Sequence, residues 1–421
     1  MSHAPPRLPA KEATSVPTRY DLTYVPLGSA GWGGAERSLL DLADRTARQG
    51  KRVLLLAEQA LKASPFEEVA RARNLDIRWV DWAPHQSLRH NLRAAQAAFR
   101  NLDSALIHFN ISWRDGMSLI PVLARMLTRS RLIGSMRALP DPADQTPRKR
   151  HLGGLIPGLR LWTIPDRIRG MLWARSLHLA VSVNRDDYPK RMIDTFGFRP
   201  ERIRVVYNGV EIPARLPDKN AYTEIRKTYH YSADDFVVCY FGRISAEKGV
   251  RYLLEALVGQ PPSVRLLVIG EGPEEAALRE TARQLGVFER VTFAGFLAQP
   301  EVVVAACDLV AVPSIWHEAF GRTVVEALAH EVPVVASRIG GMAELFNHGE
   351  HGLYVPPADS AALCQAIGSL AVDRARARQM GARGRDWVMS RFTMERVARD
   401  YNALYDELLP PRTTAPQRNR A

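Results

Sequence analysis

The stretch best equipped for chemistry is residues 318–326, where Glu318 and Glu326 frame a small apolar turn that contains Gly321. The residues after Glu326 continue in a helical pattern, and residues 332–336 have the composition of a buried strand. We therefore expect Glu318 in a loop at the mouth of a sheet and Glu326 in the first turns of a helix. Carboxylates accept hydrogen bonds from hydroxyls, and backbone N–H groups at a helix start bind oxygens or a phosphate. The arrangement suits a polyol such as a sugar or ribose; the alternative is two solvated glutamates on a helix surface.

A second such segment, residues 241–249, follows a predicted strand and carries Arg243 and Lys248. Both side chains can reach one anion at the sheet edge, where prepositioned cations stabilise the charge that develops on a diphosphate leaving group. Two ordinary surface cations are the alternative. The chain contains no Asp-x-Asp motif, and such clustered carboxylates commonly hold a divalent metal beside a diphosphate. We therefore predict no metal requirement and no other cofactor, with the two cations in the metal's place.

Two glycine-containing turns follow further predicted strands in the second half of the chain. The first, Gly270-Glu271-Gly272, fits a tight turn beside a nucleotide base, although this motif is weak by itself. The second, around Gly341, offers a flexible backbone at a helix start, with Glu344 in the first turn. An alternative interpretation of Glu344 is a charge that complements the helix dipole.

In the first half of the chain, residues 31–37 follow the first predicted strand and open a long helix. Gly33 and Gly34 let a ligand or another domain approach the backbone closely, and the helix N-terminus favours a phosphate. The glycines stand too close together for the dinucleotide-binding fingerprint, so a nicotinamide-dependent enzyme is not favoured. His108 stands just past a predicted strand end, facing the presumed cleft, where it can donate to a sugar hydroxyl or a carbonyl. A histidine satisfied inside the structure is the alternative.

The elements that must position these residues alternate between strand and helix in both halves of the chain. Strand patterns occur at 20–27, 52–57, 76–80, 104–109, 133–136, 180–183 and 203–206, and again at 236–242, 264–270, 291–294, 309–313, 332–336 and 353–355. Helical patterns separate most of them, which predicts an α/β protein with two doubly wound parallel sheets. Ligands bind at the carboxyl ends of such strands, so the cleft between the two domains is the expected active site.

The same pattern predicts the domain boundaries. We expect a disordered tail at 1–18, an N-terminal domain at 19–210, a linker at 211–234, a C-terminal domain at 235–390, a C-terminal helix at 391–409 and a disordered tail at 410–421. The polar composition of 211–234, with Pro213 and Pro217 near its start, is the basis for the linker.

Composition limits the class of protein. The 421 residues are enough for two domains, and 57 basic against 45 acidic residues give a formal charge of +12, which favours anionic partners such as nucleotides, phosphates, acidic lipid or nucleic acid. A general excess of arginine is the alternative explanation. The three cysteines are widely spaced, and the first 18 residues lack the apolar region of a signal peptide. No apolar run is long enough to span a membrane, so we expect a cytoplasmic protein.

Residues 148–175 combine seven arginine or lysine residues with apolar ones. Such a basic, apolar insertion suits peripheral contact with the inner membrane surface or with an acidic acceptor. The alternative is a helical excursion packed on its own domain, and Pro157 and Pro165 argue against one long amphipathic helix.

Taken together, these segments resemble the retaining glycosyltransferases with the two-domain GT-B fold, in the group called family 4 or glycosyl transferases group 1. The resemblance covers residues from about 20 to 408. The matching pieces, in the order of the family, are 33–36, His108, 208–210, 242–249, 270–273, 318–326 and 340–344. It implies two Rossmann-like domains that face each other across a cleft, an N-terminal acceptor-binding domain at 19–210 and a C-terminal nucleotide-sugar-binding domain at 235–390. It also implies transfer of a hexose or N-acetylhexosamine from a nucleotide-diphosphate sugar to an acceptor hydroxyl.

The resemblance also implies roles for individual residues. The catalytic set is Glu318, His108, Arg243 and Lys248, and the donor-binding set is Gly33, Gly34, Gly242, Gly270, Ala319, Phe320, Gly321, Thr323, Glu326, Gly341 and Glu344. Retention in this family is attributed to front-face attack, in which the leaving diphosphate takes the acceptor proton, so no enzyme nucleophile is expected.

The substrates stay open. UDP is the preferred nucleotide, with GDP next, and the acceptor is a glycan, a lipid-linked sugar or a small natural-product aminocyclitol. One alternative hypothesis is a sugar-nucleotide epimerase or a phosphorylase on the same fold. The other is a basic protein that binds nucleotides or nucleic acid; no recognition helix, zinc spacing or RNA-binding aromatic signature supports nucleic acid as a partner.

Overall fold

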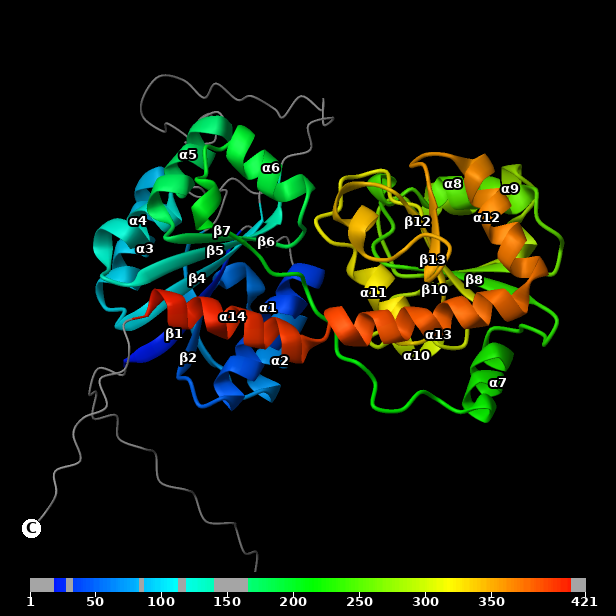
Figure 1. Ribbon diagram of the computed structural model, residues 1–421, viewed down its shortest axis with the longest axis horizontal. Helices are drawn as coiled ribbons and strands as arrows, with labels where there is room; N and C mark the ends of the chain where they lie inside the picture. The colour runs from blue at the N-terminus through cyan, green and yellow to red at the C-terminus, as the bar shows by residue number, and fades with distance from the viewer. Residues whose placement is uncertain (1–18, 28–32, 83–86, 113–118, 140–165, 410–421) are drawn as a thin grey trace, which may run out of the picture.

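Two parallel sheets organise the chain in the computed structural model, which describes residues 19–27, 33–82, 87–112, 119–139 and 166–409 (Figure 1). In this part of the chain the N-terminal sheet has the strand order β3-β2-β1-β4-β5-β6-β7 and the C-terminal sheet the order β10-β9-β8-β11-β12-β13. The prediction of two doubly wound α/β domains is confirmed.

The N-terminal strands are β1 Tyr20–Leu27, β2 Val53–Glu58, β3 Asp76–Val80, β4 Ser104–Ser112, β5 Arg131–Ala138, β6 Leu179–Ser182 and β7 Ile203–Val205. The helices of this domain are α1 Gly34–Arg48, α2 Pro65–Ala72, α3 Leu88–Arg100, α4 Ile120–Leu127, α5 Asp166–Ser176 and α6 Asp187–Asp194. Alternate residues of β1 serve the two faces of the sheet: Leu22 and Tyr24 pack under α1 and α2, whereas Val25 and Leu27 join the cluster under α3, α4 and α5. Because helices cover both faces of the sheet, the strands consist mainly of apolar residues.

The C-terminal strands are β8 Phe236–Phe241, β9 Val264–Ile269, β10 Val291–Gly295, β11 Leu309–Val312, β12 Val334–Ser337 and β13 Gly352–Val355. The helices are α7 Lys219–Thr228, α8 Val250–Val258, α9 Glu275–Gln284, α10 Pro300–Val304, α11 Arg322–Ala329, α12 Ser360–Val372, α13 Arg374–Arg391 and α14 Met394–Leu408, with short 3-10 turns at Ala246–Lys248 and Gly340–Glu344. In each sheet the first strand lies inside: β1 between β2 and β4, and β8 between β9 and β11. The order of the strands changes direction at β1 and at β8, and this change opens a crevice at the carboxyl edge of each sheet.

The segment predicted as a linker, 211–234, is not a plain linker, because it contains helix α7. The Asp218 side chain caps that helix by accepting from the Ala221 N–H at 2.9 Å. Arg226 then fixes the helix to the C-terminal domain, since its guanidinium donates to Asp308 at 3.0 Å and to the Asp235 carbonyl at 2.7 Å. A polar surface helix has the composition of a linker, which is why the sequence pattern misled here.

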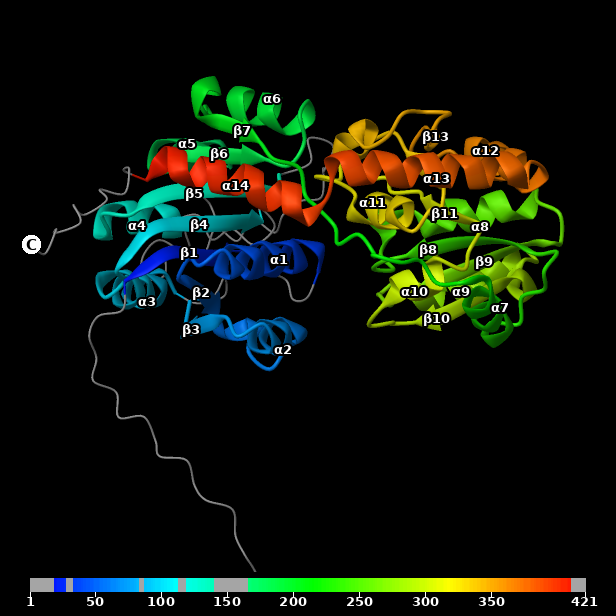
Figure 2. The ribbon, with the colours of Figure 1, turned by 60° about the horizontal axis from the view of Figure 1, so that its bottom comes forward.

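The last helix returns to the N-terminal domain. Helix α13 runs along the C-terminal domain, and α14 then lies beside α1 (Figure 1 and Figure 2). Tyr401 and Tyr405 of α14 are buried against the N-terminal sheet, where the Tyr405 hydroxyl lies 3.1 Å from that of Tyr24. The predicted C-terminal helix at 391–409 is therefore present, but it completes the fold of the first domain.

His108 belongs to this buried contact and not to the cleft. The strand β4 continues to Ser112, so His108 lies in its middle, fully buried, and the prediction that it sits past a strand end is wrong. Its Nδ1 lies 2.8 Å from the Tyr405 hydroxyl and its Nε2 lies 2.6 Å from the Ser135 hydroxyl. Satisfied on both nitrogens, the ring holds α14 on the sheet and has no access to a substrate.

The protonation of His108 should make folding depend on pH. Its pKa lies well below the ordinary value because burial, and then the charge of Arg137, disfavour the protonated ring. The folded chain keeps the ring neutral while the unfolded chain takes up a proton near pH 6.5, so stability falls as the pH drops below that value. From about pH 7.5 to 5.5 this removes about 1.4 kcal/mol of unfolding free energy, a loss that His108→Gln should abolish.

Denaturant unfolding of both proteins at the two pH values measures the difference. His178, whose pKa is lowered to about 4 by burial and by Arg125, contributes equally to both proteins and cancels. The control His230→Gln changes an exposed histidine and should keep the original pH dependence. The same dependence in His108→Gln would show that His108 is not the group held neutral.

Candidate functional site

A cavity of about 600 Å³ lies between the two domains, at the carboxyl ends of both sheets. The predicted site residues that line it are Gly33, Gly34, Gly242, Arg243, Lys248, Gly270, Glu318, Ala319, Phe320, Gly321, Thr323 and Glu326. They come from the start of α1, from the loops after β8, β9 and β11, and from the first turns of α11. The two glutamates lie as expected, Glu318 in a loop and Glu326 on a helix.

The Glu318 carboxylate is fixed inside the loop that follows β11. Its Oε1 accepts from the Ser314 hydroxyl at 2.9 Å and from the Lys248 ammonium. Lys248 therefore neutralises a carboxylate in this structure, whereas Arg243 is exposed on the cavity wall. The ion pair brings the loops after β8 and β11 together and keeps a carboxylate and an ammonium in the cavity wall, where each can interact with a charged reactant.

One wall of the cavity is formed by the loops after β8 and β9, whose backbones are in direct contact with each other. Gly242 and Gly270 have φ values of 147° and 125°, which favour glycine. A Cβ on Gly270 would lie 2.0 Å from the Gly242 carbonyl oxygen, and one on Gly272 would lie 2.0 Å from the Ile244 carbonyl oxygen. The predicted tight turn therefore also serves as the contact between two adjacent loops.

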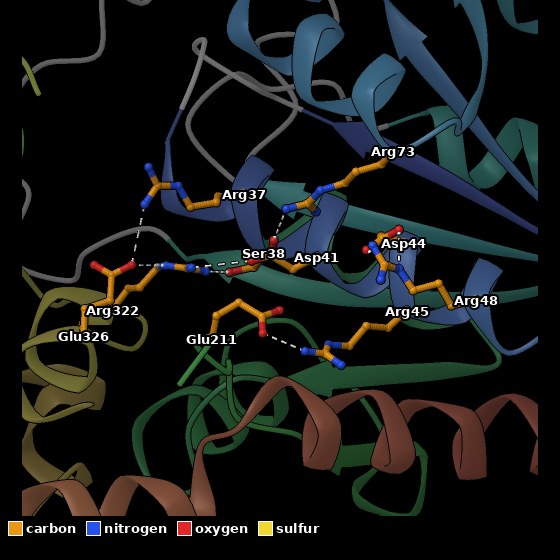
Figure 3. Close-up of polar contacts among 10 residues, drawn as sticks. All are labelled: Arg37, Ser38, Asp41, Asp44, Arg45, Arg48, Arg73, Glu211, Arg322 and Glu326. Atoms are coloured by element: carbon orange, nitrogen blue, oxygen red, sulfur yellow. Dashed lines mark hydrogen bonds and ion pairs between the residues drawn. The ribbon is translucent and has the colours of Figure 1, made fainter. Parts of the chain in front are cut away.

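A chain of charges crosses the cleft near Glu326 (Figure 3). Arg322, the first residue of α11, donates to Glu326 Oε1 at 2.6 Å and to the Ser38 hydroxyl of α1 at 3.0 Å. Arg37 Nη1 of α1 lies 3.7 Å from the same Glu326 oxygen. Burial opposes the charge on Arg322, but the carboxylates of Glu326 and Asp41 outweigh it and raise the pKa of the guanidinium.

Glu344 and Gly341 do not line the cavity, contrary to prediction. The Glu344 carboxylate accepts from the Arg185 N–H at 2.9 Å and from the Tyr207 hydroxyl at 2.8 Å, so it joins the two domains. The Gly341 N–H donates to the Glu318 carbonyl at 2.7 Å, which supports the glutamate loop from behind. Both residues act on the shape of the site because the turn after β12 packs under the loop after β11.

Sequence reasoning missed the cation at the end of β5. Arg137 is buried, lines the cavity, and donates to the amide oxygens of Asn110 and Asn208. The sequence signal that could have revealed this residue is an arginine at the end of an otherwise apolar strand. Phe296, also missed, lines the cavity with 60% of its surface exposed.

The described ranges contain neither a candidate metal-binding cluster nor a candidate membrane-spanning helix. No group of three or more histidine, cysteine, aspartate or glutamate side chains is arranged to hold a metal ion within this part of the chain. No helix formed by the same residues is long and apolar enough to cross a bilayer.

Two family models match the chain. The model described as glycosyl transferases group 1 matches residues 222–387, and the model described as glycosyltransferase family 4 matches residues 32–212. The first spans most of the C-terminal domain and the second most of the N-terminal domain.

Curated relatives match over part of their length. The chain is 34% identical over 205 residues to a GDP-mannose-dependent alpha-(1-6)-phosphatidylinositol monomannoside mannosyltransferase of Mycobacterium tuberculosis, covering 45% of this chain and 52% of the relative. It is 28% identical over 209 residues to the N-acetyl-alpha-D-glucosaminyl L-malate synthase of Bacillus anthracis, covering 49% and 54%. To a D-inositol 3-phosphate glycosyltransferase of Nocardia farcinica it is 33% identical over 215 residues, covering 48% and 46%. The chain thus spans about half the length of the curated relatives it matches.

Solved structures match over nearly the whole chain. Anabaena HepE in complex with UDP and glucose superimposes with a TM-score of 0.76 at 24% identity, covering 92% of this chain and all of HepE. Sucrose-phosphate synthase of Thermosynechococcus elongatus gives 0.73 at 22% identity, covering 92% and 99%. These likenesses establish the architecture, in which two Rossmann-like domains face each other across a cleft as in the GT-B fold.

Proposed function

We propose, from the premise that this chain belongs to the glycosyl transferases group 1 and glycosyltransferase family 4, that it moves a hexose or N-acetylhexosamine from a nucleotide-diphosphate sugar to an acceptor hydroxyl. The observation that carries the proposal is the interdomain cavity, which brings Glu318, Lys248, Arg243 and Glu326 together at the carboxyl ends of two parallel sheets. Carboxylates for hydroxyls and cations for phosphates are the groups that a sugar nucleotide needs.

We assign UDP as the donor nucleotide and keep GDP as the alternative. The Anabaena structure contains UDP and glucose, and the Mycobacterium tuberculosis relative is named as GDP-mannose-dependent. In the proposed complex Glu326 accepts from the ribose hydroxyls, and Glu318 with the backbone of 319–321 holds the donor sugar. Arg243, Lys248 and the start of α1 at Gly34 face the diphosphate, whose charge they stabilise without a metal.

The proposed reaction needs no nucleophile from the chain. The acceptor oxygen forms its bond to the anomeric carbon on the face from which the diphosphate leaves, while the bond from that carbon to the diphosphate oxygen breaks. The hydroxyl proton passes to the departing diphosphate, and configuration is retained. The side chains contribute position and charge, which are the dominant catalytic terms for a transfer of this kind.

The acceptor is proposed to lie against the N-terminal wall of the cavity, where Arg137 is held by two amide oxygens. An acceptor that carries a phosphate or carboxylate suits that guanidinium. The names of two relatives, which specify inositol 3-phosphate and L-malate, support such a small anionic acceptor. A lipid-linked acceptor reached through 148–175 remains a separate proposal, since the structure describes only 166–175 of that segment.

The donor site is tested by calorimetric binding of UDP, GDP and ADP, with and without Mg²⁺, to the original chain and to Glu326→Ala. We expect one nucleotide to bind independently of the metal and to lose about tenfold or more in affinity in the variant, because hydrogen bonds to a charged carboxylate contribute about 1.5–3 kcal/mol. Glu280→Ala, on the exposed side of α9, is the control and should bind as the original does. No binding of any nucleotide by the folded chain would reject the donor site and favour a protein that binds anions through charge alone.

A further inference from the structure

Arg322 contacts both domains at once (Figure 3). Within the C-terminal domain its Nε donates to Glu326 Oε1 at 2.6 Å. Across the cleft its Nη1 donates to the Ser38 hydroxyl at 3.0 Å and its Nη2 to Asp41 Oδ2 at 3.4 Å. One guanidinium therefore links the carboxylate of the proposed ribose site to two side chains of helix α1.

The charges around Arg322 alternate in sign and are shielded from water. Asp41 has 4% of its side chain exposed, and its other oxygen accepts from Arg73 Nη2 at 2.9 Å. The exposed fractions of Arg322 and Glu326 are 15% and 17%. Removing one member of such a buried series leaves its neighbour as an uncompensated charge, so the members favour one common arrangement.

The contacts of Glu326 show how this arrangement concerns a ligand. Arg322 and Arg37 both contact the same oxygen of its carboxylate, Oε1. The other oxygen, Oε2, points away from both guanidinium groups (Figure 3). The bonds to Ser38 and Asp41 exist only while α1 is docked against α11, so in the docked arrangement the guanidinium that contacts Glu326 is itself held by α1.

We propose that Arg322 is a positioning residue that couples occupation of the ribose site at Glu326 to docking of the N-terminal domain through Asp41 and Ser38. The inference rests on the proposed function, since the ribose is part of the nucleotide donor. Coupling of this kind is reciprocal: docking raises nucleotide affinity, and bound nucleotide stabilises the docked domains by the same factor. The acceptor wall on the N-terminal domain is thereby brought to the donor when the donor is present.

Asp41 offers a direct test, because it does not line the cavity and cannot touch a nucleotide there. A role for Arg322 confined to the C-terminal domain predicts no effect of Asp41→Asn on binding. Coupling through Arg322 predicts that Asp41→Asn weakens binding of UDP, GDP or ADP, whichever the original chain binds, by about fivefold to tenfold. In the Arg322→Met background the same substitution should change affinity less than about twofold, because the connection is already cut.

Asp44→Asn is the matched control, since Asp44 stands on the same helix and pairs with Arg48 at 3.0 Å (Figure 3). It should leave nucleotide affinity unchanged. Arg73→Met separates coupling from stability: it removes the partner of Asp41 inside the N-terminal domain but keeps the contact of Asp41 with Arg322. It should lower the melting temperature without weakening nucleotide binding. Arg322→Lys, which keeps the charge without the fork of donors, should recover part of the affinity lost in Arg322→Met.

The outcomes separate the two proposals. If the original chain binds a nucleotide and Asp41→Asn behaves like Asp44→Asn, the coupling is wrong and the donor site stands. Additive effects of Asp41→Asn and Arg322→Met would equally overturn coupling through Arg322. If the original chain, folded by its thermal transition, binds none of the three nucleotides, the proposed function fails and this inference fails with it.

Discussion

Glu318→Gln is expected to lower kcat/KM for sugar transfer by about a hundredfold to a thousandfold, with the larger part in kcat. The carboxylate is held by the Ser314 hydroxyl at 2.9 Å and by Lys248, so its charge is already in place before the substrates arrive. In the proposed transfer the anomeric carbon gains positive charge as the diphosphate leaves, and a preorganised anion stabilises that charge. The loss of one preorganised group of this kind costs about 3–4 kcal/mol in the transition state. Glutamine keeps the shape and the hydrogen bond from Ser314 but removes the charge.

The measurement is initial rate against donor concentration with a saturating acceptor, made for the original chain and two variants. Glu271→Gln is the matched control, because Glu271 also lines the cavity and undergoes the same chemical change. It should lose less than about fivefold. Equal losses in the two variants would mean that the charge of Glu318 has no special place in the reaction. A rise in KM alone would assign Glu318 to binding and remove it from the catalytic set.

The parallel sheets were predictable because their strands are buried on both faces. Runs such as 236–241 leave no polar alternation, and the helical patterns between them allow only crossover connections. The loops that follow those strands carry Glu318, Lys248 and Gly270, and strand ends in a parallel sheet share an edge. Most of the C-terminal half of the site follows from these two facts alone.

The N-terminal half could not be obtained in the same way. How far His108 lies from the cleft depends on where β4 ends, and sequence patterns place strand ends only to within a few residues. His108 is held from above by Tyr405, which lies 297 residues further along the chain. Because α14 comes from the end of the chain, the sequence around His108 contains no signal that this helix will cover it.

The contacts across the cleft are beyond sequence reasoning for a related cause. Arg322 and Asp41 are 281 residues apart, and each sits on a helix whose local pattern is complete without the other. Glu344 illustrates the reverse error: its position after a glycine turn suggested a ligand, but the docked N-terminal domain supplies its partners, Arg185 and Tyr207. Which polar residues meet a ligand and which meet the other domain is decided by the docking of two folded units.

Gly270→Ala is expected to cost about 3 kcal/mol or more of unfolding free energy and to abolish measurable nucleotide binding. At φ of 125° the residue occupies a conformation that glycine alone adopts readily, and its new Cβ would lie 2.0 Å from the Gly242 carbonyl oxygen. Backbone strain and overpacking each contribute about 1–3 kcal/mol. The loop after β9 must move away from the loop after β8, and both loops line the cavity.

Gly286→Ala separates strain from contact. Gly286 also has a positive φ, 68°, but nothing lies within 4 Å of its added Cβ, and it is not part of the cavity wall. It should lose only about 1 kcal/mol, the cost of a left-handed alanine, and keep its affinity for the nucleotide. Denaturant unfolding and nucleotide calorimetry on both variants give the comparison. If Gly270→Ala were no worse than Gly286→Ala, the two loops would not need their close backbone contact, and the floor of the donor site would have to be sought elsewhere in the cleft.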